Sequence, residues 1–174
     1  MRQINNIALM GMAAVGKSHI GKKIAAISNY EYMETDKLIA EQANQEGKRY
    51  QDLSDDDFLR IEKDVFMKLG DLSGKVIDTG ASVIYDQDVM RKIAEFAHVV
   101  YIEDRIDVIK GRFDARGPVP LMRIEGKTFE QLFIERQPLY EKYAQSTVTR
   151  NSLRNNDARL VAEQILELVR DDES

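Results

Sequence analysis

The sequence contains no cysteine among its 174 residues. Neither a disulfide framework nor a thiolate metal site is therefore available, which fits a reducing compartment. An excess of basic residues is also missing, because the formal net charge is -5 at pH 7. Nonspecific binding to nucleic acid or to an anionic membrane calls for a basic face, so we expect neither of these partners.

Long apolar runs are absent as well. No stretch approaches the roughly 20 apolar residues that a membrane span needs. The apolar run near the amino terminus is too short for a signal peptide, and no small-residue cleavage site follows it. We therefore expect a cytoplasmic protein, monomeric and with one domain over residues 1–174. A domain of this size buries roughly 70% of the surface that its unfolded chain exposes.

Short apolar runs alternate with longer amphipathic stretches along the chain. The short runs read as strands at 6–10, 30–33, 76–78, 98–102 and 147–149. The stretches with apolar residues at three-and-four spacing read as helices at 17–28, 37–45, 56–69, 86–96, 106–113, 128–143 and 157–169. This alternation predicts an α/β fold in which helices cover both faces of a parallel sheet. Ligands of such folds bind beyond the carboxyl ends of the strands.

A phosphate-binding loop follows the first predicted strand. Residues 11–18 match the motif G-x-x-x-x-G-K-[ST] between a strand and a helix. Gly11 and Gly16 permit a backbone that curls its N–H groups around phosphate oxygens, while Lys17 reaches the terminal phosphates and Ser18 ligates magnesium. The motif predicts binding of ATP with Mg²⁺. The alternative is a glycine-rich turn without a ligand.

Carboxylates end the second and third predicted strands. We assign Glu34 to the magnesium shell through water, and Asp36 to the acceptor hydroxyl as a base or orienting group. Asp78 ends an apolar run and suits a second carboxylate near magnesium. The alternatives are that Asp36 caps the following helix and that Asp78 is a solvated strand end.

The spacing of these motifs resembles that of the shikimate kinases, small members of the nucleoside-monophosphate-kinase-like P-loop group. The resemblance covers nearly the whole chain, through the segments GMAAVGKSHIG, ETDKLI, FLRIEKDVF, VIDTGAS, HVVYIEDRIDVIKGR, RGPVPL and ERQPLYEKYA. It implies a three-layer fold with strand order 2-3-1-4-5, a lid over ATP near 112–124, and a substrate-binding helical region near 36–66. It also implies ATP-dependent phosphorylation of a ring hydroxyl.

The resemblance also implies residue roles. The catalytic residues would be Lys17, Asp36 and the lid residue Arg116. The nucleotide would be bound by Gly11, Ala14, Val15, Gly16, Lys17, Ser18, His19 and Arg112. Taking this sequence's own residues into account, we expect the acceptor to be bound by Asp36, Arg60, Gly80, Ala81, Ser82 and Arg136, and the metal by Ser18, Glu34 and Asp78.

The sequence departs from the family pattern in the acceptor region. Leu59 stands where the family has the arginine that binds the substrate carboxylate. Its neighbour Arg60 is no simple replacement, because one residue along a helix rotates the side chain by about 100°. The family's glycine triplet is altered to residues 80–82, Gly-Ala-Ser, and the lid is two residues longer.

Three hypotheses follow from these departures. In the first, the chain phosphorylates shikimate, and Arg60, Arg136 and Arg116 together bind its carboxylate. In the second, it phosphorylates another small hydroxylated molecule, and Leu59 faces an uncharged part of it. In the third, it is a nucleotide-binding regulator that no longer turns over.

Overall fold

The computed structural model describes residues 6–70, 72–117, 121, 125–150 and 157–172. Its strands are β1 (Ile7–Met10), β2 (Glu31–Glu34), β3 (Lys75–Asp78), β4 (His98–Glu103) and β5 (Ser146–Thr149). Its helices are α1 (Lys17–Ile27), α2 (Thr35–Gln45), α3 (Asp55–Lys68), α4 (Gln87–Phe96), α5 (Ile106–Ala115), α6 (Phe129–Tyr143) and α7 (Ala158–Asp172). Two short 3-10 turns, η1 (Tyr50–Asp52) and η2 (Val83–Tyr85), complete the described elements.

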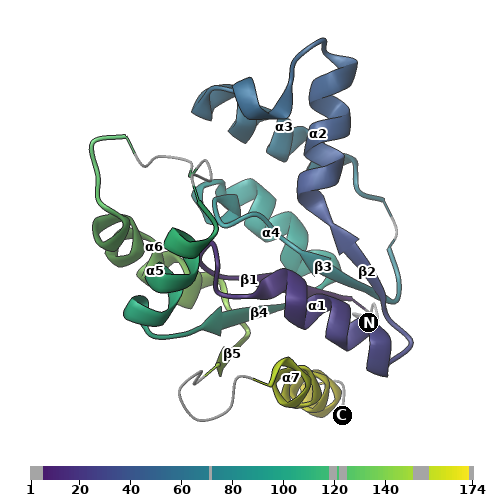
Figure 1. Cartoon of the computed structure of the whole chain (residues 1–174). Coiled ribbons are helices and arrows are strands. Elements are labelled where there is room, and N and C mark those ends of the chain that lie inside the picture. The colour runs from purple at the N-terminus through teal and green to yellow at the C-terminus, as the bar shows by residue number, and fades with distance from the viewer. Residues whose placement is uncertain (1–5, 71, 118–120, 122–124, 151–156, 173–174) are drawn as a thin grey trace.

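The strands pair in parallel in the order β2-β3-β1-β4-β5. Successive side chains of β1 point to opposite faces of the sheet, as the period of two requires. Ile7 and Leu9 join a core cluster with α1 and α7, whereas Ala8 and Met10 join a second cluster with α4 and α6. Both sheet faces are therefore covered by helices, and the predicted three-layer α/β fold and strand order are confirmed (Figure 1).

Helices α2 and α3 stand away from the sheet (Figure 1) and bury a small cluster of their own. This cluster contains Ile39, Ala43, Phe58, Ile61 and Val65. The Ser54 hydroxyl accepts a hydrogen bond from the Asp57 N–H and so caps the start of α3. The pair forms an arm that reaches past the carboxyl edge of the sheet.

The parallel register brings the ends of the central strands together. Glu34 pairs with Asp78, and Met10 pairs with Tyr101. The segments that follow β1, β2 and β3 therefore leave the sheet at one edge, where sequence reasoning placed the ligand site. Within the described part of the chain, no helix combines the length and apolar character needed to cross a membrane.

Candidate functional site

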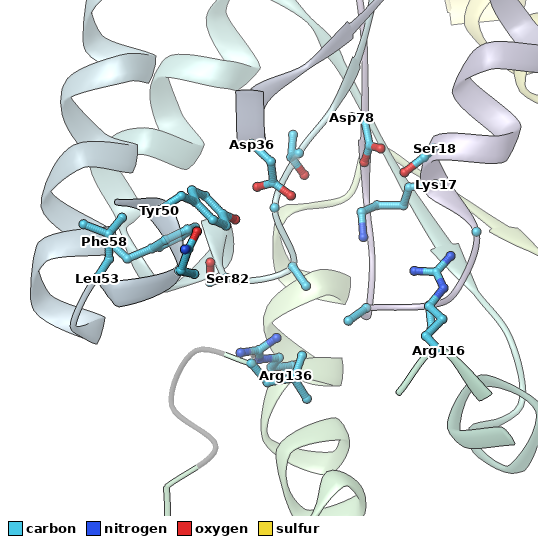
Figure 2. A pocket seen from close by; sticks show the side chains of 18 residues that line it. Lys17, Ser18, Asp36, Tyr50, Leu53, Phe58, Asp78, Ser82, Arg116 and Arg136 are labelled. Atoms are coloured by element: carbon cyan, nitrogen blue, oxygen red, sulfur yellow. The ribbon is translucent and has the colours of Figure 1, made fainter. Parts of the chain in front are cut away.

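A cavity of about 220 Å³ opens at the carboxyl edge of the sheet, between the phosphate loop and the α2–α3 arm (Figure 2). It joins the loop after β1, the start of α2, the segment after β3 and one face of α6. The cavity is lined by Ala13, Ala14, Gly16, Lys17, Ser18, Asp36, Tyr50, Gln51, Leu53, Phe58, Asp78, Thr79, Gly80, Ala81, Ser82, Arg116, Leu121 and Arg136. Many of the expected nucleotide and acceptor residues, among them Lys17, Ser18, Asp36 and Arg136, thus line one cavity.

The backbone of the phosphate loop depends on its glycines. Gly11 and Gly16 have positive φ angles of 149° and 107°. A Cβ on Gly11 would lie 2.5 Å from the Ile102 carbonyl oxygen, so the loop passes too close to β4 for any side chain there. Ala14 also adopts a positive φ, of 66°. This curled backbone is the geometry in which successive N–H groups bind an anion.

Lys17 begins α1 and is buried, with 9% of its surface exposed. Its Nζ donates to the carbonyl oxygens of Gly11 at 2.9 Å and Met12 at 3.4 Å. Burial lowers the pKa of Lys17, while the nearby charges of Asp78 and Asp36 raise it. The two carboxylates therefore favour the ammonium form that a phosphate would bind.

Ser18 and Asp78 share a neighbour in Tyr32. The Tyr32 hydroxyl donates to Asp78 Oδ2 at 2.9 Å and also hydrogen-bonds Ser18. Two hard oxygen ligands from different elements thus face one point, as Mg²⁺ requires. Among the described residues, no group of three or more acidic or histidine side chains forms a metal cage. The residues therefore fit a magnesium ion held by few protein ligands together with nucleotide phosphates.

Glu34 takes a different position from the one expected. Its Oε2 lies 3.2 Å from Lys37 Nζ, one turn along α2, and its side chain does not line the cavity. The chain turns into α2 directly after Glu34, so extended geometry does not persist to Asp36. The predicted contact of Glu34 with metal-bound water stays a prediction, and of the three expected metal residues Ser18 and Asp78 line the cavity.

Asp36 lies in the first turn of α2 and is accessible from the cavity (Figure 2). The surrounding protein atoms desolvate its carboxyl group, which raises its pKa, while the charge of Lys17 lowers it. The Tyr50 hydroxyl of η1 hydrogen-bonds the Asp36 carboxylate. This carboxylate is thus held opposite Lys17, where it can orient an attacking hydroxyl.

The segment after β3 forms the floor of the acceptor end. The Tyr140 hydroxyl of α6 donates to the Ala81 carbonyl oxygen at 2.7 Å and fixes this segment to the helix. Arg136, one turn earlier on α6, is 1% exposed but lines the cavity, and its Nε donates to the Tyr85 hydroxyl at 3.1 Å. The predicted residues Gly80, Ala81, Ser82 and Arg136 are therefore brought together.

Arg60 lies apart from the other residues expected to bind the acceptor. Its Nη2 lies 2.5 Å from Glu46 Oε2 on the outer face of the α2–α3 arm, and its side chain does not line the cavity. Leu59 packs against the apolar cluster of the arm. The helical rotation that separates neighbouring residues thus turns Arg60 to solvent. In this geometry Arg60 lies outside the cavity lining, and its contact with the acceptor stays a prediction.

The predicted lid arginine and two predicted nucleotide residues occupy distinct positions. Arg116 ends α5 and lines the cavity, where its charge acts on Lys17. Arg112 stays outside the cavity lining, with Nη1 3.2 Å from Asp104 Oδ2, and the His19 side chain is exposed. The expected lid near 112–124 lies partly outside the described residues, because 118–120 and 122–124 are not among them.

Sequence reasoning missed three side chains that shape the site: Tyr32, Tyr50 and Arg150. Arg150 follows β5, and its Nη1 donates to the Val15 carbonyl oxygen at 2.7 Å. A Cβ on Gly16 would lie 1.9 Å from the same nitrogen, so Arg150 covers the phosphate loop. The partners of Tyr32, Tyr50 and Arg150 are Asp78, Asp36 and Val15. None of these pairs is close in sequence, so no local sequence pattern predicts the contacts.

Comparisons with known proteins agree with this geometry. A family model described as shikimate kinase matches residues 13–170. Shikimate kinase 1 of Salmonella newport (strain SL254) is 28% identical over 173 residues, which cover 97% of this chain and 98% of that protein. The structure also resembles the shikimate kinase of Acinetobacter baumannii, solved in complex with shikimate, with a TM-score of 0.80 at 23% identity. That alignment covers 97% of this chain and 94% of the other.

A second solved structure gives the same result. The shikimate kinase of Bacteroides thetaiotaomicron aligns with a TM-score of 0.75 at 20% identity, over 95% of this chain and 98% of that chain. Because both solved structures are less than 25% identical to this chain, their similarity shows the fold and not the function.

Proposed function

The chain belongs to the shikimate kinase family, and on this premise we propose that it transfers the γ-phosphoryl group of ATP to a hydroxyl group of shikimate. Members of the family are phosphotransferases with an alcohol acceptor. The observation that carries the proposal is the single cavity that joins Lys17 and Ser18 at one end to Asp36 and Arg136 at the other.

Positive charge gathers where the phosphates would bind. Lys17 and Arg116 face this end of the cavity, and the phosphate loop directs backbone N–H groups there. These groups would spread the charge of the transferring phosphoryl group. A magnesium ion, held by Ser18 and Asp78, would supply further neutralisation of phosphate charge.

Asp36 would align the attacking oxygen. Its carboxylate lines the cavity across from Lys17, and Tyr50 holds it in place by a hydrogen bond. Its raised pKa favours a group that can accept a proton from a hydroxyl as transfer proceeds. Arg136 supplies a guanidinium at the same end, where it can bind an acidic group of the acceptor.

The test is release of ADP by the purified protein with ATP and Mg²⁺, with and without shikimate. Shikimate-dependent release supports the proposal. ATP binding without ADP release across a panel of acceptors contradicts it and favours a regulator.

A second candidate is phosphorylation of a different small hydroxylated molecule. The observation in its favour is that α3 directs no guanidinium into the cavity, since Leu59 packs within the arm and Arg60 pairs with Glu46. Robust ADP release with a neutral polyol and none with shikimate would identify this alternative.

A further inference from the structure

Glu62 is a buried acid beneath the acceptor end of the cavity. It lies on α3, and 1% of its surface is exposed. Its Oε1 has no hydrogen-bond partner among the described residues. The Ser82 hydroxyl hydrogen-bonds this carboxyl group. An unpaired buried oxygen is costly and native proteins contain few of them, so its surroundings call for an explanation.

Three oxygen-bearing side chains meet around Gly80. A Cβ built on Gly80 would lie 2.9 Å from Glu62 Oε1, 3.6 Å from Asp36 Oδ1 and 3.8 Å from Ser82 Oγ. Glu62 therefore lies directly against the segment that forms the cavity floor. Ser82 is the member of this segment whose side chain both lines the cavity and reaches Glu62.

Helix α3 offers no cation to this group. Leu59 lies within the apolar cluster of the arm, and Arg60 faces solvent with Glu46. Arg136 of α6 is the guanidinium whose charge acts on Glu62. We call Leu53, Phe58 and Ser82 the α3 wall of the cavity; Tyr50 and Gln51 also line this side, and none of these five residues carries a positive charge.

We propose that Glu62 is a positioning residue that orients the Ser82 hydroxyl, and that Ser82 recognises an uncharged hydroxyl group of the acceptor at this wall. The inference rests on the proposed phosphoryl transfer to a small-molecule hydroxyl and narrows its substrate class. If Ser82 recognises a hydroxyl group in this way, the carboxylate of an acidic acceptor does not bind next to Ser82.

Ser82 prefers a substrate hydroxyl to a carboxylate because its side chain has only one proton to donate. A serine hydroxyl has one proton to donate and two lone pairs that accept. When Ser82 donates its proton to Glu62, it offers the cavity acceptor sites only. A substrate hydroxyl can donate to them, whereas a carboxylate has no proton to give. The charge of Asp36, which acts on Glu62 at this floor, further disfavours a second anion.

The first experiment measures KM and kcat for variants of the pair. We expect Ser82→Ala to raise the acceptor KM about three- to tenfold, the worth of one neutral hydrogen bond, with little change in kcat. Glu62→Leu should raise KM similarly, and Glu62→Gln, which keeps an acceptor for Ser82, should restore it. The double variant Ser82→Ala/Glu62→Leu should be no worse than either single variant. Unchanged KM in both single variants would overturn the proposal while leaving the phosphotransferase function intact.

The second experiment measures binding and does not depend on turnover. Calorimetry with a non-hydrolysable ATP analogue and Mg²⁺ compares shikimate with its uncharged methyl ester. We expect the wild type to bind both compounds, because Arg136 lines the cavity and can still bind a carboxylate that lies away from Ser82. Leu59→Arg should shift the ratio of the two affinities towards shikimate about tenfold, because a guanidinium binds a carboxylate through two charge-assisted hydrogen bonds. Leu38→Arg places the same side chain in the same apolar cluster from α2 and should leave the ratio unchanged.

The outcomes separate the two proposals. Absence of ADP release with either compound contradicts the proposed function, and the binding ratio still tests the role of the α3 wall. A Ser82→Ala variant that loses affinity for shikimate but not for its ester overturns the inference, because that result would place the carboxylate next to Ser82. Failure to bind the ester also overturns it, because the ester presents the hydroxyl groups that the wall should recognise.

Discussion

At the scale of single residues, Lys17 is a buried cation on which both carboxylates of the cavity act. Its Nζ is held by the carbonyl oxygens of Gly11 and Met12, and the charges of Asp78 and Asp36 act on it. A buried ammonium held by two neutral carbonyl oxygens can exchange them for phosphate oxygens, which carry charge. Lys17 is thus prepared for a polyanion before the nucleotide arrives.

Replacing Lys17 should therefore abolish turnover. We expect Lys17→Ala to lose more than about 99% of kcat, because an electrostatic contact to the transferring group contributes ~10²-fold or more. The measurement is acceptor-dependent ADP release at saturating ATP. Lys23→Ala, on the same helix but outside the cavity, serves as the control and should retain its rate. A near-normal rate in Lys17→Ala would remove this residue from the mechanism.

Asp36 should affect transfer and not nucleotide binding. Asp36→Asn keeps the shape of the side chain and a hydrogen bond to Tyr50 but removes the basic oxygen. We expect phosphoryl transfer to fall ~10²-fold or more, as for loss of a general base, with the ATP dissociation constant preserved. Single-turnover kinetics and calorimetry measure the two quantities separately. The exposed Asp56→Asn is the matched control, and equal transfer rates in both variants would contradict the role of Asp36.

Glu62 should make stability fall as pH rises. Burial, and then the charge of Asp36, raises the pKa of Glu62 from 4.5 to about 8. Between these values the folded state binds more protons at this position than the unfolded state. The free energy of unfolding therefore decreases with pH, by up to about 1.4 kcal/mol per pH unit from this group. Glu62→Gln cannot titrate, so its stability should decline less steeply between pH 5 and 8.

Urea denaturation across this pH range tests the prediction. The exposed Glu41→Gln variant, on α2, provides the control and should follow the wild-type slope. Parallel curves for the wild type and Glu62→Gln would mean that Glu62 has no raised pKa in the folded protein.

How much of the site could be predicted depended on the range of the interactions. Residues 11–18 were predicted because one local motif fixes both the backbone and the chemistry. Tyr32 and Arg150 were missed because their partners lie far away in sequence, at Asp78 and Val15. The position of Arg60 outside the cavity lining could not be predicted, because tertiary packing of Phe58 and Ile61 sets the rotation of α3 relative to the cavity.

At the scale of elements, the strands and helices were predicted within a few residues. Each carries its own period, and the parallel sheet buries both faces of its central strands. The turns η1 and η2 were not predicted, since three residues show no period. Yet η1 supplies Tyr50 to Asp36. An irregular segment thus contributed one of the site residues that the sequence pattern did not predict.

Helix α6 presents Arg136 and Tyr140, and its start is fixed by a capping box. The Thr128 hydroxyl accepts from the Gln131 N–H at 3.1 Å, and the Gln131 side chain accepts from the Thr128 N–H at 2.8 Å. We expect Thr128→Ala to cost about 1 kcal/mol of stability. For a protein of this size that lowers Tm by about 2–4 °C. Thr128→Ser retains the cap and should melt near the wild type.

Thermal unfolding followed by circular dichroism measures this difference. Identical melting of Thr128→Ala and Thr128→Ser would show that the capping box adds no stability. The acceptor KM of Thr128→Ala should stay close to that of the wild type, because Tyr140 also fixes α6 to the cavity floor through Ala81.

At the scale of the whole molecule, the cavity lies between a body and an arm. The sheet and its covering helices share two large apolar clusters, whereas α2 and α3 share a small separate one (Figure 1). The arm contributes Asp36, Tyr50, Leu53 and Phe58, and the body contributes Lys17, Ser18 and Arg136. An acceptor that contacts both sides connects them, so binding should suppress opening of the arm.

Hydrogen exchange can separate the two closures that this arrangement predicts. ADP with Mg²⁺ should slow exchange in the described lid residues 114–117, because Arg116 faces the phosphate end. Addition of the acceptor should slow the amides of α2 and α3 about tenfold more, while β1, β3 and β4 stay unchanged. The Asp36→Asn variant with nucleotide and acceptor serves as the control, because its arm can close while phosphoryl transfer is slow. If nucleotide alone fully protects the amides of α2 and α3 from exchange, the acceptor does not drive closure of the arm. If nucleotide does not change the exchange rates of residues 114–117, this segment is not part of the lid.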